Sequence, residues 1–271
     1  MTDATLEKIK QFSSDQYSNE HRLNARIQIY RYGENKVNLR EWTFKHLDFS
    51  NVKDVLELGA GNGLFWKTNI GNIPKDIRIV LTDVSQGMLD AAGDSLKPFR
   101  RCFEYALIDA DKEMPYPENS FQMIIANHML YHVKELTQTL TDINRVLTPD
   151  GAAYATTLSR QNTRELIKLA LGFDRRLWFD NLTIRSFNME NGRSMISNHF
   201  DNVEEFVYQN NIIVNNPEPL ILYLASGYSD ALLDILVEKL DDFRLYLRGY
   251  LRKNGPLRIT NNTVLYKFRK K

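Results

Sequence analysis

The chain has 271 residues, of which 43% are hydrophobic and 25% charged, which is the composition of an ordinary globular protein. Its formal net charge of +1 gives no general electrostatic reason to expect a nucleic acid or an anionic membrane as partner. The single cysteine, Cys102, excludes an intrachain disulfide and a zinc site made of several cysteines.

Residues 1–50 are polar and mostly helical in pattern, with Leu6 and Ile9 on one helix face and a turn at residues 33–35. This segment either caps a ligand site or packs on the sheet as a helical flank. In the first case the guanidinium groups of Arg26 and Arg31 are candidates to hold a substrate carboxylate. In the second case both are surface or structural residues.

Strand and helix patterns alternate from residue 51 to residue 158, which predicts parallel βαβ units. Apolar runs predict strands at residues 52–58, 77–83, 103–108, 121–126 and 152–158, the last after a turn at residues 148–151. Before that turn, Leu136, Leu140, Ile143 and Leu147 recur at helical spacing, so we expect a helix packed on the sheet.

After residue 158 the pattern predicts several helices and two further strands. The helices are expected at residues 163–173, 192–200 and 217–225, with one longer helix at 232–251, and the strands at 203–208 and 263–268. The sequence therefore predicts an α/β fold with a doubly wound, mostly parallel sheet of about seven strands. We expect a single domain over residues 1–271, with a helical N-terminal cap or flank (1–50), a cofactor-binding core (51–158) and a substrate-side C-terminal half (159–271).

The turn after the first predicted strand contains three alternating glycines, Gly59, Gly61 and Gly63. Glycine lets the backbone turn sharply and approach a ligand without a Cβ in the way, and the amides that open the next helix face that ligand. The spacing is G-x-G-x-G, whereas a dinucleotide fingerprint is G-x-G-x-x-G. The turn therefore predicts a small, partly polar cofactor and speaks against NAD.

Polar side chains stand at the ends of four successive predicted strands: Glu57, Asp83, Asp109, and Asn127 with His128. Ligands of a doubly wound sheet bind beyond the carboxyl ends of its strands, so these side chains are expected to surround one site. Asp83 has the position of an acceptor for ribose hydroxyls, which either a dinucleotide or another nucleoside cofactor would use.

These segments resemble the class I S-adenosylmethionine-dependent methyltransferases, in the broad group that includes the ubiquinone and menaquinone biosynthesis methyltransferases. The resemblance rests on five ordered motifs, at residues 55–63, 81–89, 109–121, 127–133 and 145–151. It covers residues 51–158, whereas the flanks, which usually select the substrate, match less clearly. Tyr116 and Gln122 replace a frequent Phe and a frequent Asp, and neither touches the expected cofactor groups. The resemblance also implies that the closing strand at 263–268 is antiparallel.

The resemblance implies a role for each cofactor-binding residue. Glu57 and the turn would hold the methionine part of S-adenosylmethionine, and Asn127 would lie near it. Asp83, next to Val84, would accept the ribose hydroxyls, and Asp109 would face the adenine amino group with Ala110 beside it. The turn residues included are Gly59, Ala60, Gly61, Asn62 and Gly63.

Methyl transfer needs no signature nucleophile, because alignment of the acceptor with the carbon–sulfur bond can supply ~7–11 kcal/mol of the barrier. A general base would add roughly 10²–10⁴-fold if the acceptor starts protonated. The candidates are His128, Tyr131 and His132, whose alternative role is ordinary packing or hydrogen bonding. His128 and His132 have a spacing that can bind zinc on a helix, but the glutamate of H-E-x-x-H is missing, so we predict no metal site.

We therefore expect methyl transfer to a small-molecule acceptor with release of S-adenosylhomocysteine. One alternative is a protein that binds the cofactor without catalysis, and another is a dinucleotide-dependent oxidoreductase. A third is a nucleic-acid methyltransferase, for which the basic stripe Arg244, Arg248 and Arg252 is the only support. No stretch approaches the ~20 apolar residues that span a bilayer, and residues 1–11 lack a signal-peptide core, so we expect a cytoplasmic protein without a membrane span.

Overall fold

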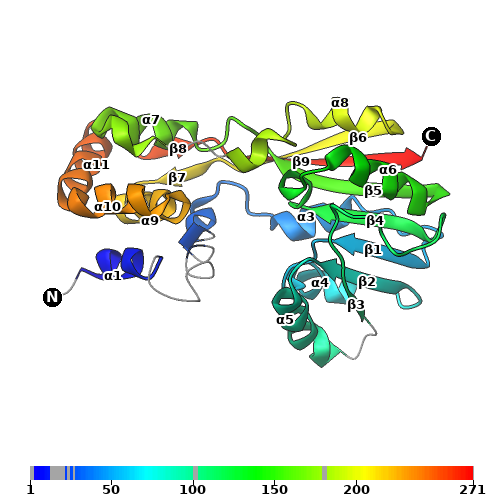
Figure 1. The fold of residues 1–271 in the computed structure, drawn as a ribbon. Coiled ribbons are helices and arrows are strands. Elements are labelled where there is room, and N and C mark those ends of the chain that lie inside the picture. Colours follow the sequence, from blue (N-terminus) through cyan, green and yellow to red (C-terminus); the bar gives the residue numbers. More distant parts are fainter. Residues whose placement is uncertain are drawn as a thin grey trace. The chain divides into compact units, whose positions relative to one another are not determined.

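A seven-stranded sheet carries the glycine turn, and its strands lie in the order β3-β2-β1-β4-β5-β9-β6 in the computed structural model (Figure 1). The structure describes residues 3–12, 22, 25–26, 28–99, 103–178 and 182–270, without the side chains of Leu182 and Thr183, so Cys102 lies outside the described residues. The strands are β1 (Asp54–Leu58), β2 (Arg78–Asp83), β3 (Phe103–Leu107), β4 (Phe121–Asn127), β5 (Leu147–Leu158), β6 (Phe200–Gln209) and β9 (Asn262–Lys270).

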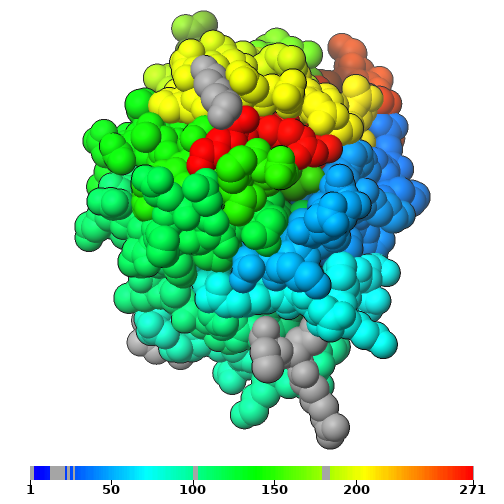
Figure 2. All heavy atoms as spheres, turned by 90° about the vertical axis from the view of Figure 1, so that its right-hand side faces the viewer, coloured from blue at the N-terminus to red at the C-terminus, as the bar shows by residue number. Residues whose placement is uncertain are grey.

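The pairing of the strands confirms the predicted fold class. β1 pairs in parallel with β2 and with β4, β2 pairs in parallel with β3, and β4 pairs in parallel with β5. β9 pairs with β5 in antiparallel orientation, as the resemblance implied. Figure 2 shows the atoms of β9 in red between the yellow and green atoms of neighbouring segments. Because the parallel strands end at one edge, the polar residues that follow them share that edge.

Each face of the sheet is covered by its own helices. Helices α3 (Leu39–Lys45), α4 (Leu64–Asn69) and α5 (Gln86–Leu96) contribute Phe44, Trp66 and Leu96 to a core cluster on one face. Helices α6 (Leu136–Val146) and α8 (Gly192–Ser197) contribute Leu140 and Ile196 to the cluster on the other face. Successive strand residues alternate between the faces, so Val55 belongs to the first cluster and Leu56 to the second.

The predicted turn at residues 148–151 is part of a longer strand. β5 begins at Leu147, which pairs with Phe121, and the register then shifts before Ala152 pairs with Met123. The proline and glycine of this stretch are accommodated as an irregularity of the sheet, which is where such residues occur in strands.

A second set of elements has an apolar core of its own. It comprises helices α1 (Ala4–Lys10), α7 (Arg164–Phe173), α9 (Pro217–Gly227), α10 (Asp230–Glu238) and α11 (Leu240–Asn254) with the two-stranded pair β7 (Ile212–Val214) and β8 (Leu257–Ile259). These elements share one apolar core that includes Ile9, Leu166 and Phe243. The sequence did not predict β7 and β8, because a three-residue strand carries too short a pattern to detect.

The expected long helix at residues 232–251 is wrong, since the structure has two helices that meet at Lys239. This residue has φ −111° and ψ 18°, outside the α-helical region, and its ammonium binds Asp174 at 2.9 Å. The apolar spacing continues across the break from Leu236 to Leu240 and Phe243, all buried. Periodicity alone therefore cannot reveal the break.

Contacts between Cα atoms divide the chain into two compact units. We call residues 37–160, 182–208 and 263–271 the sheet unit, and residues 1–36, 161–181 and 209–262 the helical unit. The expectation of a single domain with flanks stays a prediction, because dense contacts do not test independent folding. Among the described residues, no helix has the length and apolar character needed to cross a membrane.

A buried ion pair fixes the segment that precedes β4. Asp142 on α6 is 3% exposed in its side chain and accepts hydrogen bonds from Arg145 Nε at 2.6 Å and from the Met114 amide. Arg145 also donates to the carbonyl oxygens of Tyr116 and Met114, at 2.6 and 2.9 Å. One guanidinium thus holds the chain between the third and fourth strands against α6.

We predict that Arg145→Met lowers the free energy of unfolding by about 2–3 kcal/mol, because it leaves the buried Asp142 carboxylate without its charged partner. Urea unfolding followed by circular dichroism measures the loss. Arg193→Met is the control, since Arg193 is exposed and its pair with Glu205 spans 3.4 Å, so a change within about 0.5 kcal/mol is expected. Equal losses in the two variants would contradict the role of the buried pair.

Candidate functional site

The glycine turn adopts a backbone that only glycine accepts without strain. Gly59, Gly61 and Gly63 have φ of 64°, 55° and 71°. A Cβ at Gly59 would lie 2.7 Å from Met129 Cβ, and one at Gly63 would lie 3.0 Å from Leu96 Cδ1. A Cβ at Gly61 would meet nothing within 4 Å, so this glycine borders open space. The outer two glycines therefore serve packing, and the middle one leaves room for a ligand.

Hydrogen bonds fix the turn to the end of β2. The Ala60 amide donates to the carbonyl of Thr82 at 2.8 Å, and the Gly61 amide donates to Asp83 Oδ2 at 2.9 Å. The Asn62 side chain accepts from the Leu64 amide at 3.3 Å at the start of α4. Asp83 also accepts from the Ser85 amide at 2.9 Å through Oδ1. Each carboxylate oxygen of Asp83 keeps a second lone pair for a ligand.

Glu57 is a buried carboxylate at the end of β1. It is 1% exposed, and Trp66 Nε1 donates to its Oε2 at 2.5 Å while Asn127 Nδ2 donates to its Oε1 at 3.2 Å. Burial raises the pKa of Glu57 to about 7, and the charge of Asp83 acts in the same direction, against the two hydrogen bonds. A cation brought to this carboxylate would relieve the cost of burying its charge.

The ends of β2 and β3 present acids beside exposed apolar side chains. Asp109 accepts from the Asp111 amide at 3.1 Å and pairs with Lys112 at 3.3 Å, and these contacts lower the pKa of Asp109. Val84, directly after Asp83, is 68% exposed, and Leu107, the register partner of Asp83, is 59% exposed. The edge can therefore receive a ligand with one polar and one apolar side.

The Ala110 carbonyl already accepts a hydrogen bond from Thr139 Oγ1 at 2.7 Å. This bond ties the end of the third strand segment to α6. Ala110 thus has its place beside Asp109, as expected, but its carbonyl oxygen is shared with the scaffold.

Asn127 and the aromatic candidates lie beyond β4. The Asn127 side chain bridges Glu57 and Thr156, whose Oγ1 donates to Asn127 Oδ1 at 3.2 Å. His128 has a left-handed φ of 51° and donates its amide to Thr156. The ring of Tyr131 lies 6.5 Å from that of His128 and 4.6 Å from that of His132, between centroids. The structure therefore brings these three candidates together at one strand end.

The two histidines do not share a continuous helix, because His128 precedes the short 3-10 turn Leu130–His132. Burial, with a smaller effect of the Arg40 guanidinium, lowers the pKa of His128 to about 4, and burial also lowers the pKa of His132. The ring of His128 is therefore neutral near pH 7, and burial favours the neutral form of His132. Within the described part of the chain, no group of three or more His, Cys, Asp or Glu side chains could hold a metal ion.

Two residues near this edge were missed by the sequence analysis. Trp66 is fully buried in the core, and its indole nitrogen also binds Glu57. Arg40, on α3, is partly buried, and its positive charge contributes a smaller part of the lowered pKa of His128. No sequence motif marks either residue. Arg26, considered for a substrate carboxylate, donates instead to the carbonyl of Ser226 at 3.0 Å inside the helical unit.

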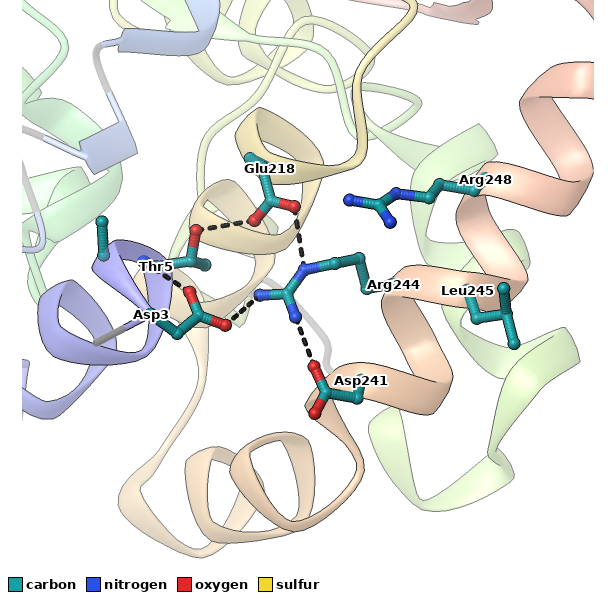
Figure 3. A pocket seen from close by; sticks show the side chains of 8 residues that line it. Asp3, Thr5, Glu218, Asp241, Arg244, Leu245 and Arg248 are labelled. Atoms are coloured by element: carbon teal, nitrogen blue, oxygen red, sulfur yellow. Dashed lines mark hydrogen bonds and ion pairs between the residues drawn. The ribbon is translucent and has the colours of Figure 1, made fainter. Parts of the chain in front are cut away.

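A surface pocket of about 510 Å³ in the helical unit is built around an ion-pair network (Figure 3). Arg244 pairs with Asp3, Glu218 and Asp241 at 2.6, 2.9 and 2.5 Å. These carboxylates hold α1, α9 and α11 together, so the pocket has a structural explanation. The first arginine of the basic stripe is thereby neutralised, which weakens the nucleic-acid alternative.

Comparison with known families agrees with the geometry of the glycine edge. Residues 56–155 match the family described as "Methyltransferase domain". This segment contains the glycine turn, the acids Glu57, Asp83 and Asp109, and the candidates His128 and His132. This segment of the chain therefore resembles a methyltransferase domain in sequence. The membership in the ubiquinone-related group that the resemblance suggested is not resolved by this match.

The methyltransferase domain is also similar in sequence to two curated proteins. A malonyl-[acyl-carrier protein] O-methyltransferase of Legionella pneumophila is 30% identical over 126 residues, which cover 45% of this chain and 43% of that protein. The highly reducing polyketide synthase rstn3 of Aspergillus nomiae is 28% identical over 130 residues, or 44% of this chain and 5% of that protein. The chain thus spans less than half the length of these relatives.

Solved structures share the fold of the methyltransferase domain and its flanks. Phosphoethanolamine N-methyltransferase 2 of Haemonchus contortus, solved with phosphomonomethylethanolamine and S-adenosylhomocysteine, has a TM-score of 0.54 at 17% identity and covers 99% of this chain and 60% of its own. The [4+2]-cyclase SpnF has a TM-score of 0.56 at 15% identity and covers 99% of this chain and 97% of its own. At these identities the likeness shows the fold alone.

We predict that Glu57 makes the sheet unit less stable as the pH rises. Its pKa in the folded protein, about 7, lies above the usual 4.5, so the folded state binds more protons between these values and its stability falls with rising pH. From pH 5.5 to 8 this contribution falls by roughly 2 kcal/mol. Glu57→Gln should remove that part of the pH dependence in urea unfolding.

Glu118→Gln, at an exposed position, is the control and should keep the wild-type pH dependence. A Glu57→Gln curve parallel to the wild-type curve would show that burial does not shift this carboxyl group.

Proposed function

We propose that the protein transfers a methyl group from S-adenosylmethionine to a small-molecule acceptor and releases S-adenosylhomocysteine. The observation that carries this proposal is the opening at Gly61, bordered by the buried acid Glu57 and by Asp83. The expectation of a cytoplasmic location remains part of the proposal.

The residues at the edge fit the parts of this cofactor. Glu57 would bind the ammonium of the methionine part, and this cation would offset the cost of burying the Glu57 carboxylate. Asn127 would hold the Glu57 carboxylate in place through its hydrogen bond. Asp83 has free lone pairs for the ribose hydroxyls. Asp109 would accept from the adenine amino group beside Ala110, and Val84 offers an exposed apolar face to the base.

The acceptor would lie over the end of β4, where His128, Tyr131 and His132 gather. S-adenosylmethionine supplies an already activated methyl group, so the chain mainly has to orient the acceptor and exclude water. The neutral imidazole of His132 is available to take a proton from an acceptor that starts protonated. The pKa of about 4 makes His128 the weaker base of the two.

The names of the similar proteins point to different methyl acceptors. The Legionella protein is named for the malonyl group on a carrier protein, and the Haemonchus enzyme was solved with a phosphorylated amine. SpnF, with the same fold, is named as a cyclase, so the fold by itself does not establish methyl transfer. Binding of the cofactor without methyl transfer is therefore the second candidate.

Titration calorimetry with S-adenosylhomocysteine tests the cofactor site, and we predict saturable binding of one ligand per chain. Release of S-adenosylhomocysteine during incubation with S-adenosylmethionine and a panel of small amines, thiols, hydroxy acids and phenols then tests transfer. The absence of binding at millimolar ligand would reject the proposal. Binding without turnover of any acceptor would favour the non-catalytic alternative.

We predict that Gly61→Ala lowers the affinity for S-adenosylhomocysteine at least roughly tenfold, because the new Cβ enters the ligand opening. Gly255→Ala is a matched control, since Gly255 also has a positive φ, 78°, and also borders open space, but at the end of α11. Gly61→Ala should cost roughly 1–2 kcal/mol of stability through backbone strain. Gly255→Ala should cost roughly 1–3 kcal/mol, because the ψ of Gly255, −168°, lies in a region that essentially only glycine adopts. Only the first should change the dissociation constant, and equal effects on binding would contradict the placement of the ligand.

A further inference from the structure

Thr156, on β5, places a buried hydroxyl group beside Asn127. Thr156 is 1% exposed, and the pairing of β4 with β5 makes it the register partner of Asn127. Its Oγ1 accepts a hydrogen bond from the His128 amide at 3.0 Å and donates one to Asn127 Oδ1 at 3.2 Å. The strand pairing itself therefore holds this hydroxyl against the Asn127 side chain.

These contacts determine which way round the Asn127 amide lies. A backbone N–H can only donate, so the Thr156 hydroxyl accepts from His128 and uses its own hydrogen for the bond to Asn127 Oδ1. A flipped amide would leave that hydrogen without a partner among the described residues. It would also turn Oδ1 towards the Glu57 carboxylate, oxygen against oxygen. The Asn127 Nδ2 group therefore points at Glu57 Oε1, to which it donates at 3.2 Å.

Glu57 consequently meets a donor at each of its carboxylate oxygens. Trp66 Nε1, which can only donate, binds Oε2 at 2.5 Å, and Asn127 binds Oε1. The Thr82 hydroxyl donates to the backbone carbonyl of Glu57 at 2.8 Å and so fixes its main chain as well. These contacts suit the carboxylate form of Glu57, whose remaining lone pairs can only accept. A ligand group that meets this carboxylate must donate hydrogen bonds, as an ammonium does.

We propose that Thr156 is a positioning residue that makes the cofactor site selective for a ligand with an ammonium group. The inference rests on the proposed function, in which Glu57 binds the ammonium of S-adenosylmethionine. Thr156 acts through Asn127, because its hydroxyl holds the amide with Nδ2 towards Glu57. Without the hydroxyl, the amide can present either atom, and in the flipped orientation its oxygen stabilises the protonated form of Glu57. An uncharged Glu57 binds an ammonium more weakly.

Titration calorimetry on the full chain compares S-adenosylhomocysteine with its desamino analogue, which lacks only the ammonium group. The wild type should prefer S-adenosylhomocysteine at least roughly tenfold, the contribution expected of one charged hydrogen-bonded contact. Thr156→Val has nearly the same shape without the hydroxyl and should narrow this preference to about threefold or less, through weaker binding of S-adenosylhomocysteine. Thr156→Ser keeps the hydroxyl and should retain most of the preference.

Thr157→Val is the matched control. Thr157 is the next residue of β5 and fully buried, and its hydroxyl donates to the carbonyl of Phe187 at 3.0 Å on the other face of the sheet. The loss of this hydroxyl should leave the preference unchanged. Asn127→Leu also has nearly the shape of the residue that it replaces, and it removes the next group in the relay. It should therefore narrow the preference as Thr156→Val does.

A preference that stays at the wild-type value in Thr156→Val or in Asn127→Leu would overturn the inference. An equal narrowing in Thr157→Val would also overturn it, because any lost buried hydroxyl would then have the same effect. A wild type that binds both ligands equally well would overturn it as well, since no selection for the ammonium would exist. Failure of the wild type to bind S-adenosylhomocysteine would instead reject the proposed function.

Discussion

The buried carboxylate of Glu57 is the constraint on which the rest of the site depends. It ends β1 at a point where the chain must turn sharply, and its two hydrogen bonds come from Trp66 on α4 and Asn127 at the end of β4. The same carboxylate thus joins the segment after the glycine turn to the neighbouring strand. Such an acid is costly in a folded protein, and a structure retains it only where its charge is used or compensated.

Much of the sheet unit could be predicted from the sequence, because its determinants are local. Buried parallel strands read as apolar runs, the glycines mark a backbone that other residues cannot adopt, and polar residues at successive strand ends meet by topology. The elements of the helical unit were harder to predict from the sequence. The break at Lys239 interrupts an apolar period that continues on both sides, and β7 and β8 are too short to recognise.

The missed site residues have a common physical reason. Trp66 has an apolar body that explains its burial, so nothing in its sequence context points to the indole nitrogen. Arg26, the sequence-based candidate for holding a substrate carboxylate, donates instead to the backbone carbonyl of Ser226, a contact that no local sequence pattern predicts.

The most direct test of the central claim is proton linkage in the binding of S-adenosylhomocysteine, measured by calorimetry at pH 7 in buffers of different ionisation enthalpy. If Glu57 receives the ammonium of the ligand, binding must convert its half-protonated carboxyl group to the carboxylate. We expect release of about half a proton per ligand from the wild type, and no such release from Glu57→Gln. Tight binding with no exchange of protons in the wild type would contradict the assignment of Glu57.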